Sequence, residues 1–313
     1  MIKDHFFNRY QIKLDSEINY VDAQQERGIL YLCNSEGIFT YNIHSMELNR
    51  KLKYEEGVEK FNILSNKDII FISDGNLMLY TKKKIFNLIN DNNIISVRDF
   101  LIDLNENMIF FIAEIINEYK LDSELSSYGI YALDFKWRYF KKITDKIYSI
   151  IPSFIDIING TILLFDNENE LFNIIKIDIN DYEYLNILEK INNIESITLC
   201  NEEIYYSIYE NNVKTLYQQN HEKNKLICNI EGEKGHLNIF KISPNKKWMI
   251  YLNTLISKSY LILMHIKTKN MYIIEYLKPE SNIYWTLSGN EIVYTNDSFL
   301  YVLRSNFLSC SHT

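Results

Sequence analysis

The feature that most constrains the fold of this sequence is a repeat of short apolar segments. Apolar runs such as DIIFI, MIFFI, TILLF and WMIYL alternate with short polar turns along the whole chain of 313 residues. A unit of about 40 residues with several strand-like segments is typical of repeated four-stranded β-sheets. The units begin near Ile18, Val58, Val97, Ser153, Glu195, Asn238 and Ile283.

The second segment of most units is apolar on both faces, which predicts a strand covered by protein on both sides. A turn signal precedes this segment at the same place in successive units. The signals are Ser65-Asn66-Lys67, Asn105-Glu106-Asn107, Asn159-Gly160, Asn201-Glu202, Pro244-Asn245 and Ser288-Gly289-Asn290. The pattern therefore predicts antiparallel sheets that stack face to face.

One hairpin gives this repeat a family resemblance. The segment Ile242–Tyr251, ISPNKKWMIY, resembles the "SPDGKWIAY" hairpin of TolB-like and WD40-type β-propeller blades, and Trp285–Tyr294 is a weaker copy. Gly235-His236 stands where WD40 repeats carry a structural Gly-His pair, although the Trp-Asp pair of those repeats is absent. The resemblance implies an all-β, seven-bladed propeller, and propellers of this group usually serve as rigid protein-interaction platforms.

On this reading residues 1–313 form a single propeller domain. The expected blades span 18–55, 58–90, 97–144, 153–190, 195–230, 237–277 and 283–304. The last blade shows only three strands, so we expect residues 6–14 to supply its fourth strand and close the fold. Closure removes exposed sheet edges. Deleting residues 1–15 should therefore destabilise the whole protein.

Two stretches also fit a helical period, namely 99–121 and 181–199. Asn105-Glu106-Asn107 and Asn192-Asn193 interrupt them where the repeat requires turns. We favour strands, with an insertion at 115–127 in the third blade.

The common catalytic motifs are missing. The sequence holds no GxGxxG, P-loop, HExxH or GxSxG pattern. The histidines are not spaced as metal ligands, and His44 and His221 fall in predicted solvated turns. The acidic run Asp166–Glu170 offers oxygen ligands for calcium but does not match an EF-hand loop. We therefore predict no catalytic residue, no metal site and no cofactor.

Charge and targeting features suggest where the protein works. The net charge of −8 does not favour nucleic-acid binding. The N-terminus lacks a signal-peptide pattern, and no apolar run is long enough to span a membrane. The four cysteines are far apart. We expect a reduced, cytoplasmic protein that binds neither nucleic acid nor membrane.

The blade assignment sorts the loops onto two faces with opposite charge. Acids dominate the loops between blades and between second and third strands, whereas lysine and arginine dominate the other loops. We expect the acidic face to bind a protein or a basic peptide segment, either alone or as a subunit of a hetero-complex. The predicted binding residues are Glu118, Asp122, Glu124, Asp166 and Glu168 in loops, and Glu59, Arg98, Asp99 and Asn238 near the mouth of the central channel.

The main hypothesis is thus a non-catalytic interaction platform. A propeller enzyme, either a hydrolase or a lyase, is the alternative, with its site at the channel mouth. A small-ligand sensor using the same mouth is a further alternative. A cluster of carboxylates or a pair of histidines at the mouth would favour an enzyme.

Overall fold

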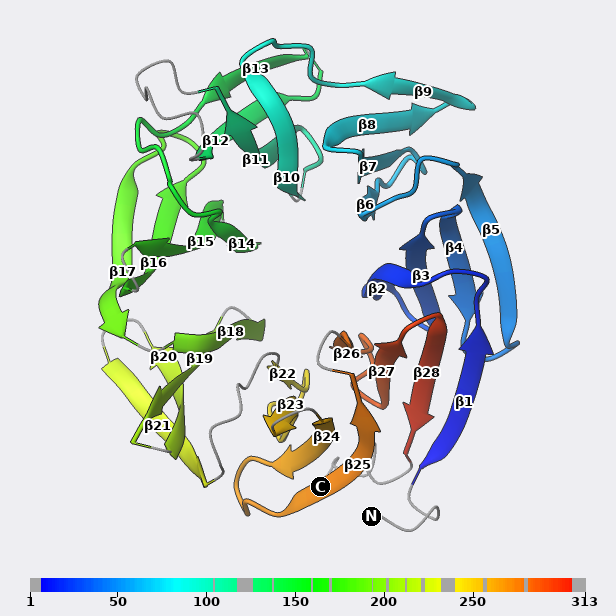
Figure 1. Cartoon of the computed structure of the whole chain (residues 1–313), viewed down its shortest axis with the longest axis vertical. Coiled ribbons are helices and arrows are strands. Elements are labelled where there is room, and N and C mark those ends of the chain that lie inside the picture. The colour runs from blue at the N-terminus through cyan, green and yellow to red at the C-terminus, as the bar shows by residue number, and fades with distance from the viewer. Residues whose placement is uncertain are drawn as a thin grey trace. The chain divides into compact units, whose positions relative to one another are not determined.

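The computed structural model describes residues 7–305 except 104, 117–125, 137, 159, 169–170, 193, 201–202, 212, 221–222, 232–239, 256–257 and 279–280. In this part of the chain every regular element is a strand. The same residues include no helix that is long and apolar enough to cross a membrane. The 28 strands form seven four-stranded antiparallel sheets, which we call blades 1 to 7 (Figure 1).

The chain clusters into two compact units, which we describe separately. Unit 2 is Glu56–Asn192 and holds three blades. Blade 2 has β6 (Lys60–Ile63), β7 (Ile69–Ser73), β8 (Asn76–Thr81) and β9 (Lys84–Asn87). Blade 3 has β10 (Ile94–Ile102), β11 (Met108–Ile115), β12 (Ser127–Asp134) and β13 (Tyr139–Lys142). Blade 4 has β14 (Ser153–Ile158), β15 (Thr161–Glu168), β16 (Leu171–Asp178) and β17 (Tyr184–Asn192).

Unit 1 is Met1–Glu55 with Asn193–Thr313 and holds the other four blades. Blade 1 has β2 (Ile18–Glu26), β3 (Ile29–Asn34), β4 (Gly37–Asn42) and β5 (Glu47–Lys53). Blade 5 has β18 (Ile194–Cys200), β19 (Glu203–Glu210), β20 (Val213–Asn220) and β21 (Lys223–Glu231). Blade 6 has β22 (Phe240–Ile242), β23 (Trp248–Leu255), β24 (Lys258–His265) and β25 (Met271–Leu277). Blade 7 has β26 (Ile283–Trp285), β27 (Glu291–Asn296), β28 (Phe299–Arg304) and β1 (Asn8–Lys13).

The predicted fold class, an all-β propeller of seven four-stranded blades, is confirmed. The helical alternative is wrong, because β10, β11, β17 and β18 occupy the described parts of the two ambiguous stretches. The insertion of blade 3 lies largely outside the described residues.

The N-terminal strand completes blade 7 as predicted. β1 pairs antiparallel with β28 from Asn8 opposite Arg304 to Lys13 opposite Phe299. Figure 1 shows this pairing as a blue strand beside a red one. Tyr10 and Ile12 of β1 pack on the apolar cluster between blades 7 and 1. The first and last parts of the chain therefore form one sheet.

The core lies between neighbouring blades within each unit. In unit 2 one cluster joins blades 2 and 3, and another joins blades 3 and 4. The second strands are the most buried elements: all five residues of β7 are buried, and Phe110 and Phe111 of β11 are fully buried. This arrangement explains the doubly apolar segment of β11, which contributes to the cluster with blade 2 on one face and to the cluster with blade 4 on the other.

The turn between first and second strands has the same geometry in four blades. Leu64, Asp103, Ser243 and Thr286 each accept, at the backbone carbonyl, a hydrogen bond from the residue three positions later. That later residue is left-handed each time: Lys67 (φ 71°), Glu106 (φ 57°), Lys246 (φ 56°) and Gly289 (φ 69°). Side chains reinforce three of these turns, because Asp103, Ser243 and Thr286 accept backbone N–H bonds from residues four or five positions later.

The first strands of the blades, here called inner strands, contact one another within each unit. β10 contacts β14 in unit 2, and β22 contacts β18 and β26 in unit 1. Several inner strands carry a β-bulge, where two residues oppose one. The extra residues include Asn19 in β2, Ile95 and Arg98 in β10, Ile155 in β14 and Glu195 in β18. A bulge re-aims the side chain of its extra residue.

Candidate functional site

A cluster of charged side chains on and beside the inner strands of blades 2 and 3 is the best candidate site. It consists of Glu59, Lys60, Arg98, Asp99 and Glu114, and we call it the inner charged cluster. Arg98 is the extra residue of the β10 bulge, between Val97 and Asp99, which pair with Ala113 and Ile112. Because the bulge leaves Arg98 without a cross-strand pair, it aims the arginine side chain in a direction that a regular ladder would not give it.

The Arg98 guanidinium is held by a carboxylate but remains accessible. Its Nε donates to Glu114 Oε2 at 3.2 Å, and its Nη2 forms an ion pair with the same oxygen. The Arg98 side chain is 44% exposed, whereas Glu114 is only 12% exposed. Two of the five guanidinium N–H groups serve Glu114, which leaves donors for a bound anion.

Glu114 is fixed as an anion. The hydrogen bond from Arg98 lowers the pKa of the Glu114 carboxyl, and Ser126 and Ser96 donate to it as well. Glu114 in turn raises the pKa of Arg98. The pair is therefore permanently charged near neutral pH, and Glu114 orients the arginine rather than exchanging protons.

A second ion pair joins the two inner strands. Lys60 Nζ of β6 donates to Asp99 Oδ1 at 2.5 Å and to the Phe100 carbonyl at 3.0 Å. Asp99 Oδ1 also accepts the backbone N–H of Phe100 at 2.8 Å. This pair is less than 30% exposed and fixes the spacing of β6 and β10.

Glu59 supplies the cluster's uncommitted carboxylate. Its backbone N–H donates to the Ile72 carbonyl, and its side chain is exposed. Among the described residues the Glu59 carboxylate has no hydrogen-bond partner, yet it lies close enough to raise the pKa of Arg98. A free carboxylate beside an accessible guanidinium is a suitable general base next to an anion-binding group.

A small cleft lies along the start of β10. Its volume is about 150 Å³, and its polar lining comes from Asn76, Asn87, Asn90 and Asp91. Ligand pockets usually measure ~300–1,000 Å³. This cleft therefore suits a single polar group rather than a whole oligomeric ligand.

The structure brings together only some of the residues predicted to bind a partner. Glu59, Arg98 and Asp99 meet in the inner charged cluster. Glu118, Asp122, Glu124 and Asn238 lie outside the described residues. Asp166 does not lie in a loop, because β15 continues to Glu168. Asp166 is 1% exposed and pairs with Lys146 Nζ at 2.6 Å. The binding roles of these residues, including Glu168, remain predictions.

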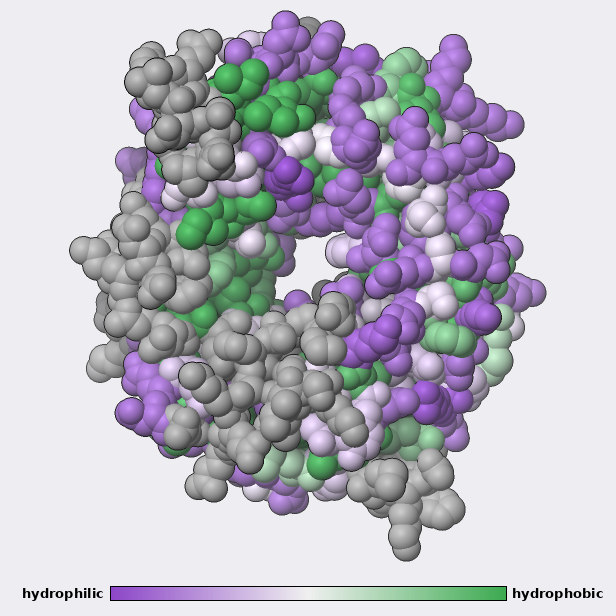
Figure 2. All heavy atoms as spheres, viewed as in Figure 1, coloured by the Kyte–Doolittle hydropathy of each residue, from purple (hydrophilic) through white to green (hydrophobic). Residues whose placement is uncertain are grey.

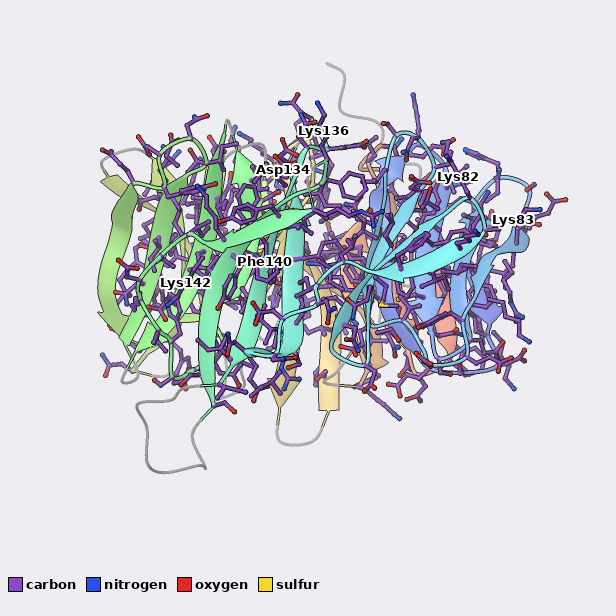
Figure 3. The ribbon with its side chains drawn as sticks, turned by 90° about the horizontal axis from the view of Figure 1, so that it is seen from above. Lys82, Lys83, Asp134, Lys136, Phe140 and Lys142 are labelled. Carbon is purple, nitrogen blue, oxygen red and sulfur yellow. The ribbon has the colours of Figure 1, made fainter. Side chains whose placement is uncertain are left out.

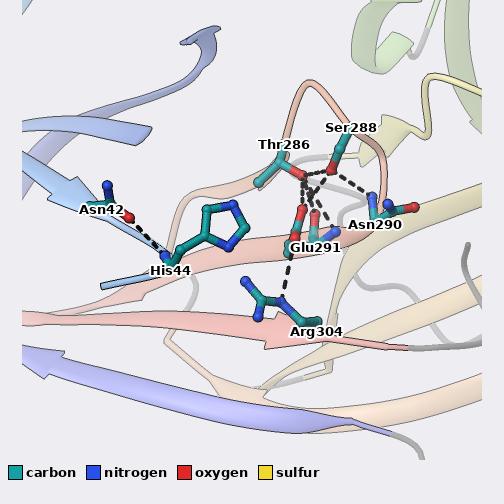
Figure 4. Close-up of polar contacts among 7 residues, drawn as sticks. All are labelled: Asn42, His44, Thr286, Ser288, Asn290, Glu291 and Arg304. Atoms are coloured by element: carbon teal, nitrogen blue, oxygen red, sulfur yellow. Dashed lines mark hydrogen bonds and ion pairs between the residues drawn. The ribbon is translucent and has the colours of Figure 1, made fainter. Parts of the chain in front are cut away.

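A buried carboxylate in blade 7 has a structural explanation. Glu291 Oε2 accepts hydrogen bonds from the hydroxyls of Thr286 and Ser288, both at 2.6 Å, and Oε1 lies 3.5 Å from Arg304 Nε (Figure 4). These contacts close the turn between β26 and β27. Figure 4 also shows His44, whose backbone N–H donates to Asn42 Oδ1. The His44 side chain is exposed, as the sequence predicted.

Metal-ligand geometry is not evident in the described ranges. Among those residues, no group of three or more His, Cys, Asp or Glu side chains could hold a metal ion. His265 packs edge-on against Trp248 at a ring-centroid distance of 4.8 Å and interacts with Thr268. His265 is therefore a packed residue.

Sequence reasoning missed Lys60, Glu114 and Ser126. Lys60 and Asp99 are far apart in the chain, and Glu114 sits at the end of a strand that is otherwise apolar. The alternation around Arg98 gave no sign of a bulge, because one inserted residue does not disturb a repeat of about 40 residues.

Comparison with known proteins supports the fold. No protein-family model and no curated protein matches the chain. Among solved structures, an oligogalacturonate lyase in complex with manganese has a TM-score of 0.73 at 9% identity, covering 96% of this chain and 97% of that one. An oligogalacturonate lyase from Vibrio parahaemolyticus has a TM-score of 0.69 with the same identity and coverage. This chain shares their fold.

The comparison corrects the main functional hypothesis. We predicted a non-catalytic interaction platform, but the two solved structures named above, which this chain resembles over almost its full length, are enzymes. The alternative, a propeller enzyme, agrees better with these findings. Sequence reasoning preferred the platform because no catalytic motif was visible.

Proposed function

We propose that this protein is a lyase that cleaves short uronate oligosaccharides at the inner charged cluster. The observation that carries the proposal is Arg98, a half-exposed guanidinium at an inner-strand bulge beside a free carboxylate. The fold shared with oligogalacturonate lyases supports the choice of substrate class. A uronate carries the carboxylate that a guanidinium binds with two parallel hydrogen bonds.

The roles follow from the chemistry of β-elimination. A base removes the proton from the ring carbon that bears the carboxylate, and the electron pair forms a carbon–carbon double bond. The glycosidic C–O bond on the next carbon breaks, and the leaving oxygen takes up a proton. In our proposal Glu59 accepts the first proton, and Arg98 stabilises the charge that develops on the substrate carboxylate.

The remaining residues of the cluster position these two groups. Glu114, Ser96 and Ser126 hold the Arg98 side chain from the protein side. The Lys60–Asp99 pair ties β6 to β10 and so fixes Glu59, which immediately precedes Lys60, relative to Arg98. Such preorganisation avoids reorientation during the reaction.

The test is the formation of unsaturated product from oligogalacturonate, followed by the absorbance of the new conjugated double bond. We expect Arg98→Lys to lower kcat/KM by about 100-fold, because one point charge replaces the planar fork. Glu59→Gln should lower kcat with little change in KM.

Matched controls exist in the same chain. Arg50→Lys alters another strand arginine, which pairs with Glu36 at 2.7 Å, and Glu55→Gln alters an exposed acid that precedes Glu59 in the sequence. Both controls should leave turnover unchanged. If the wild-type protein yields no unsaturated product from any uronate oligomer, the proposal fails.

A further inference from the structure

The outer edge of blades 2 and 3 carries a group of cations that the proposed reaction does not use. We call Lys82, Lys83, Lys84, Lys136, Arg138 and Lys142 the basic edge. They come from the turn between β8 and β9, from β9, from the turn between β12 and β13, and from β13. In Figure 3, Lys82, Lys83 and Lys136 lie toward the upper rim.

The two blades meet at this edge. The Arg138 guanidinium lies over the Phe86 ring of β9, 5.7 Å from its centroid. Phe86 is 36% exposed and the adjoining Tyr139 is 67% exposed. Hydrophilic side chains dominate the surface over β9 in Figure 2. The edge thus alternates cations with accessible aromatic rings.

Among the described residues, four of the six cations form no ion pair with a neighbouring acid. Within the described part of the chain Lys82, Lys83, Lys84 and Arg138 form no ion pair, whereas Lys60, Lys146, Lys246 and Lys278 each do. Asp134 is the acid at this edge, and its Oδ1 accepts the backbone N–H of Lys136 at 2.9 Å. Lys82, Lys83, Lys84 and Arg138 therefore place positive charge that has no described ion-pair partner on a chain of net charge −8.

The backbone at Lys82-Lys83 gives an independent reason to seek a function. β8 and β9 are joined by only these two residues, since Thr81 pairs with Lys84. Both are left-handed, with φ of 48° and 63°. Asn-Gly is the preferred pair in such a turn, and lysine is unfavourable there because its Cβ lies too close to the following carbonyl oxygen. A pair of lysines in a strained turn points to a role for their charge.

From these observations we infer that the basic edge binds an acidic polysaccharide chain at a distance from the inner charged cluster. Lysine and arginine match the repeated carboxylates of a polyuronate, and Phe86 and Tyr139 offer flat faces on which sugar rings stack. The inference rests on the proposed function for its choice of polymer. It adds a second site that retains long substrate while the inner charged cluster acts on a chain end or a short product.

The decisive variant is Lys82→Asn/Lys83→Gly, measured for binding of long polygalacturonate. The favoured turn residues should raise Tm by at least about 2 °C. Binding should weaken roughly 30-fold, at about fivefold per cation. The slope of log affinity against log salt should become shallower by one to two. Loss of affinity in a more stable protein cannot be misfolding.

The control is Lys225→Asn/Lys267→Asn, which removes the same charge from exposed positions in unit 1. It should bind the polymer as wild type does. An equal loss in the control, or unchanged binding in the turn variant, overturns the inference. Tighter binding of single-stranded RNA or of anionic vesicles than of polygalacturonate of matched charge also overturns it.

Failure of this inference can be told apart from failure of the proposed function. Arg98→Lys should lose turnover of digalacturonate and keep polymer binding, whereas the turn variant should keep turnover of digalacturonate and lose polymer binding. If neither wild type nor any variant has lyase activity but the turn variant still loses polymer binding, the basic edge is supported as a binding site and the proposed reaction is refuted. If digalacturonate is cleaved and the turn variant binds the polymer as wild type does, the proposed reaction is supported and the inference about the basic edge is refuted.

Discussion

Arg98 gains its position from a one-residue bulge and its orientation from Glu114. The carboxylate is 12% exposed and accepts hydrogen bonds from Arg98, Ser96 and Ser126. Because these bonds favour the charged form, the pKa of Glu114 is lower in the folded protein than its ordinary value of 4.5. Proton binding is therefore linked to unfolding at this residue.

This linkage gives a prediction for acid stability. The stabilisation from Glu114 is fully present above about pH 4.5 and is lost as the pH falls through the lower, folded-state pKa. Glu114→Gln should therefore flatten the fall of the unfolding free energy below about pH 4.5. Urea unfolding of both proteins at a series of pH values measures the unfolding free energy. The same dependence on pH in Glu114→Gln as in wild type would show that the Arg98–Glu114 pair does not form.

Glu291 provides a second residue-scale prediction. Removing this carboxylate takes away an acceptor of the Thr286 and Ser288 hydroxyls and the ion-pair partner of the Arg304 guanidinium. Glu291→Ala should therefore destabilise the protein by about 2–4 kcal/mol. Glu47→Ala, at an exposed turn where Ser45 donates to the carboxylate at 3.2 Å, should stay within about 0.5 kcal/mol. Similar losses for both variants in chemical denaturation would argue against the turn-closing role.

The N-terminal strand supplies the prediction for a single element. β1 provides the outermost strand of blade 7, and Tyr10 and Ile12 pack on the cluster between blades 7 and 1. Deleting residues 1–13 should cost about 3 kcal/mol or more, since two apolar side chains lose their contacts. Scanning calorimetry should show the main transition at lower temperature. Gln11→Ala, on the exposed side of β1, is the control. A main transition at the wild-type temperature would mean that β1 contributes no packing.

The strands and turns of the blades were predictable from local residue patterns. Continuous apolar runs predicted β7 and β11, and turn signals such as Ser65-Asn66-Lys67 predicted the loops between first and second strands. The bulges were not predictable, because an extra residue at Arg98 leaves the surrounding alternation intact. The left-handed turn at Lys82-Lys83 was also missed, since lysine is a poor residue for that conformation.

At the scale of the whole molecule, the sequence predicted the fold well and the site only in part. The repeat length predicted seven blades, and the strand missing from the last blade predicted that β1 completes it. Glu59, Arg98 and Asp99 were predicted as binding residues near the channel mouth, and that role stays a prediction. Their neighbours Lys60 and Glu114 were not predicted, because these contacts depend on strand register. Function was hardest, because fold is shared among proteins with different sites. The arrangement of the two units as a single domain remains a prediction.

Uneven burial across the blades predicts an order of hydrogen exchange for the whole chain. Residues of β3, β7, β11 and β27 are almost all buried, whereas β5, β9 and β13 are largely exposed. We expect amides of the second strands to exchange slowest in every blade and those of the fourth strands fastest. Mass spectrometry of exchanged peptides tests this order. Equal protection across a blade would show that each blade opens as one unit.

The bulges of the inner strands have a consequence for how such a protein acquires new activities. In β2, β10 and β18 the extra residue stands opposite the same part of the second strand, at Cys33, Ile112 and Ser207. Since this residue is left out of the ladder, its side chain is replaceable without loss of a cross-strand pair. Asn19 occupies in blade 1 the position that Arg98 occupies in blade 3. A single codon change at a bulge is thus enough to place a new chemical group on an inner strand, and the repeat offers that opportunity several times in one gene.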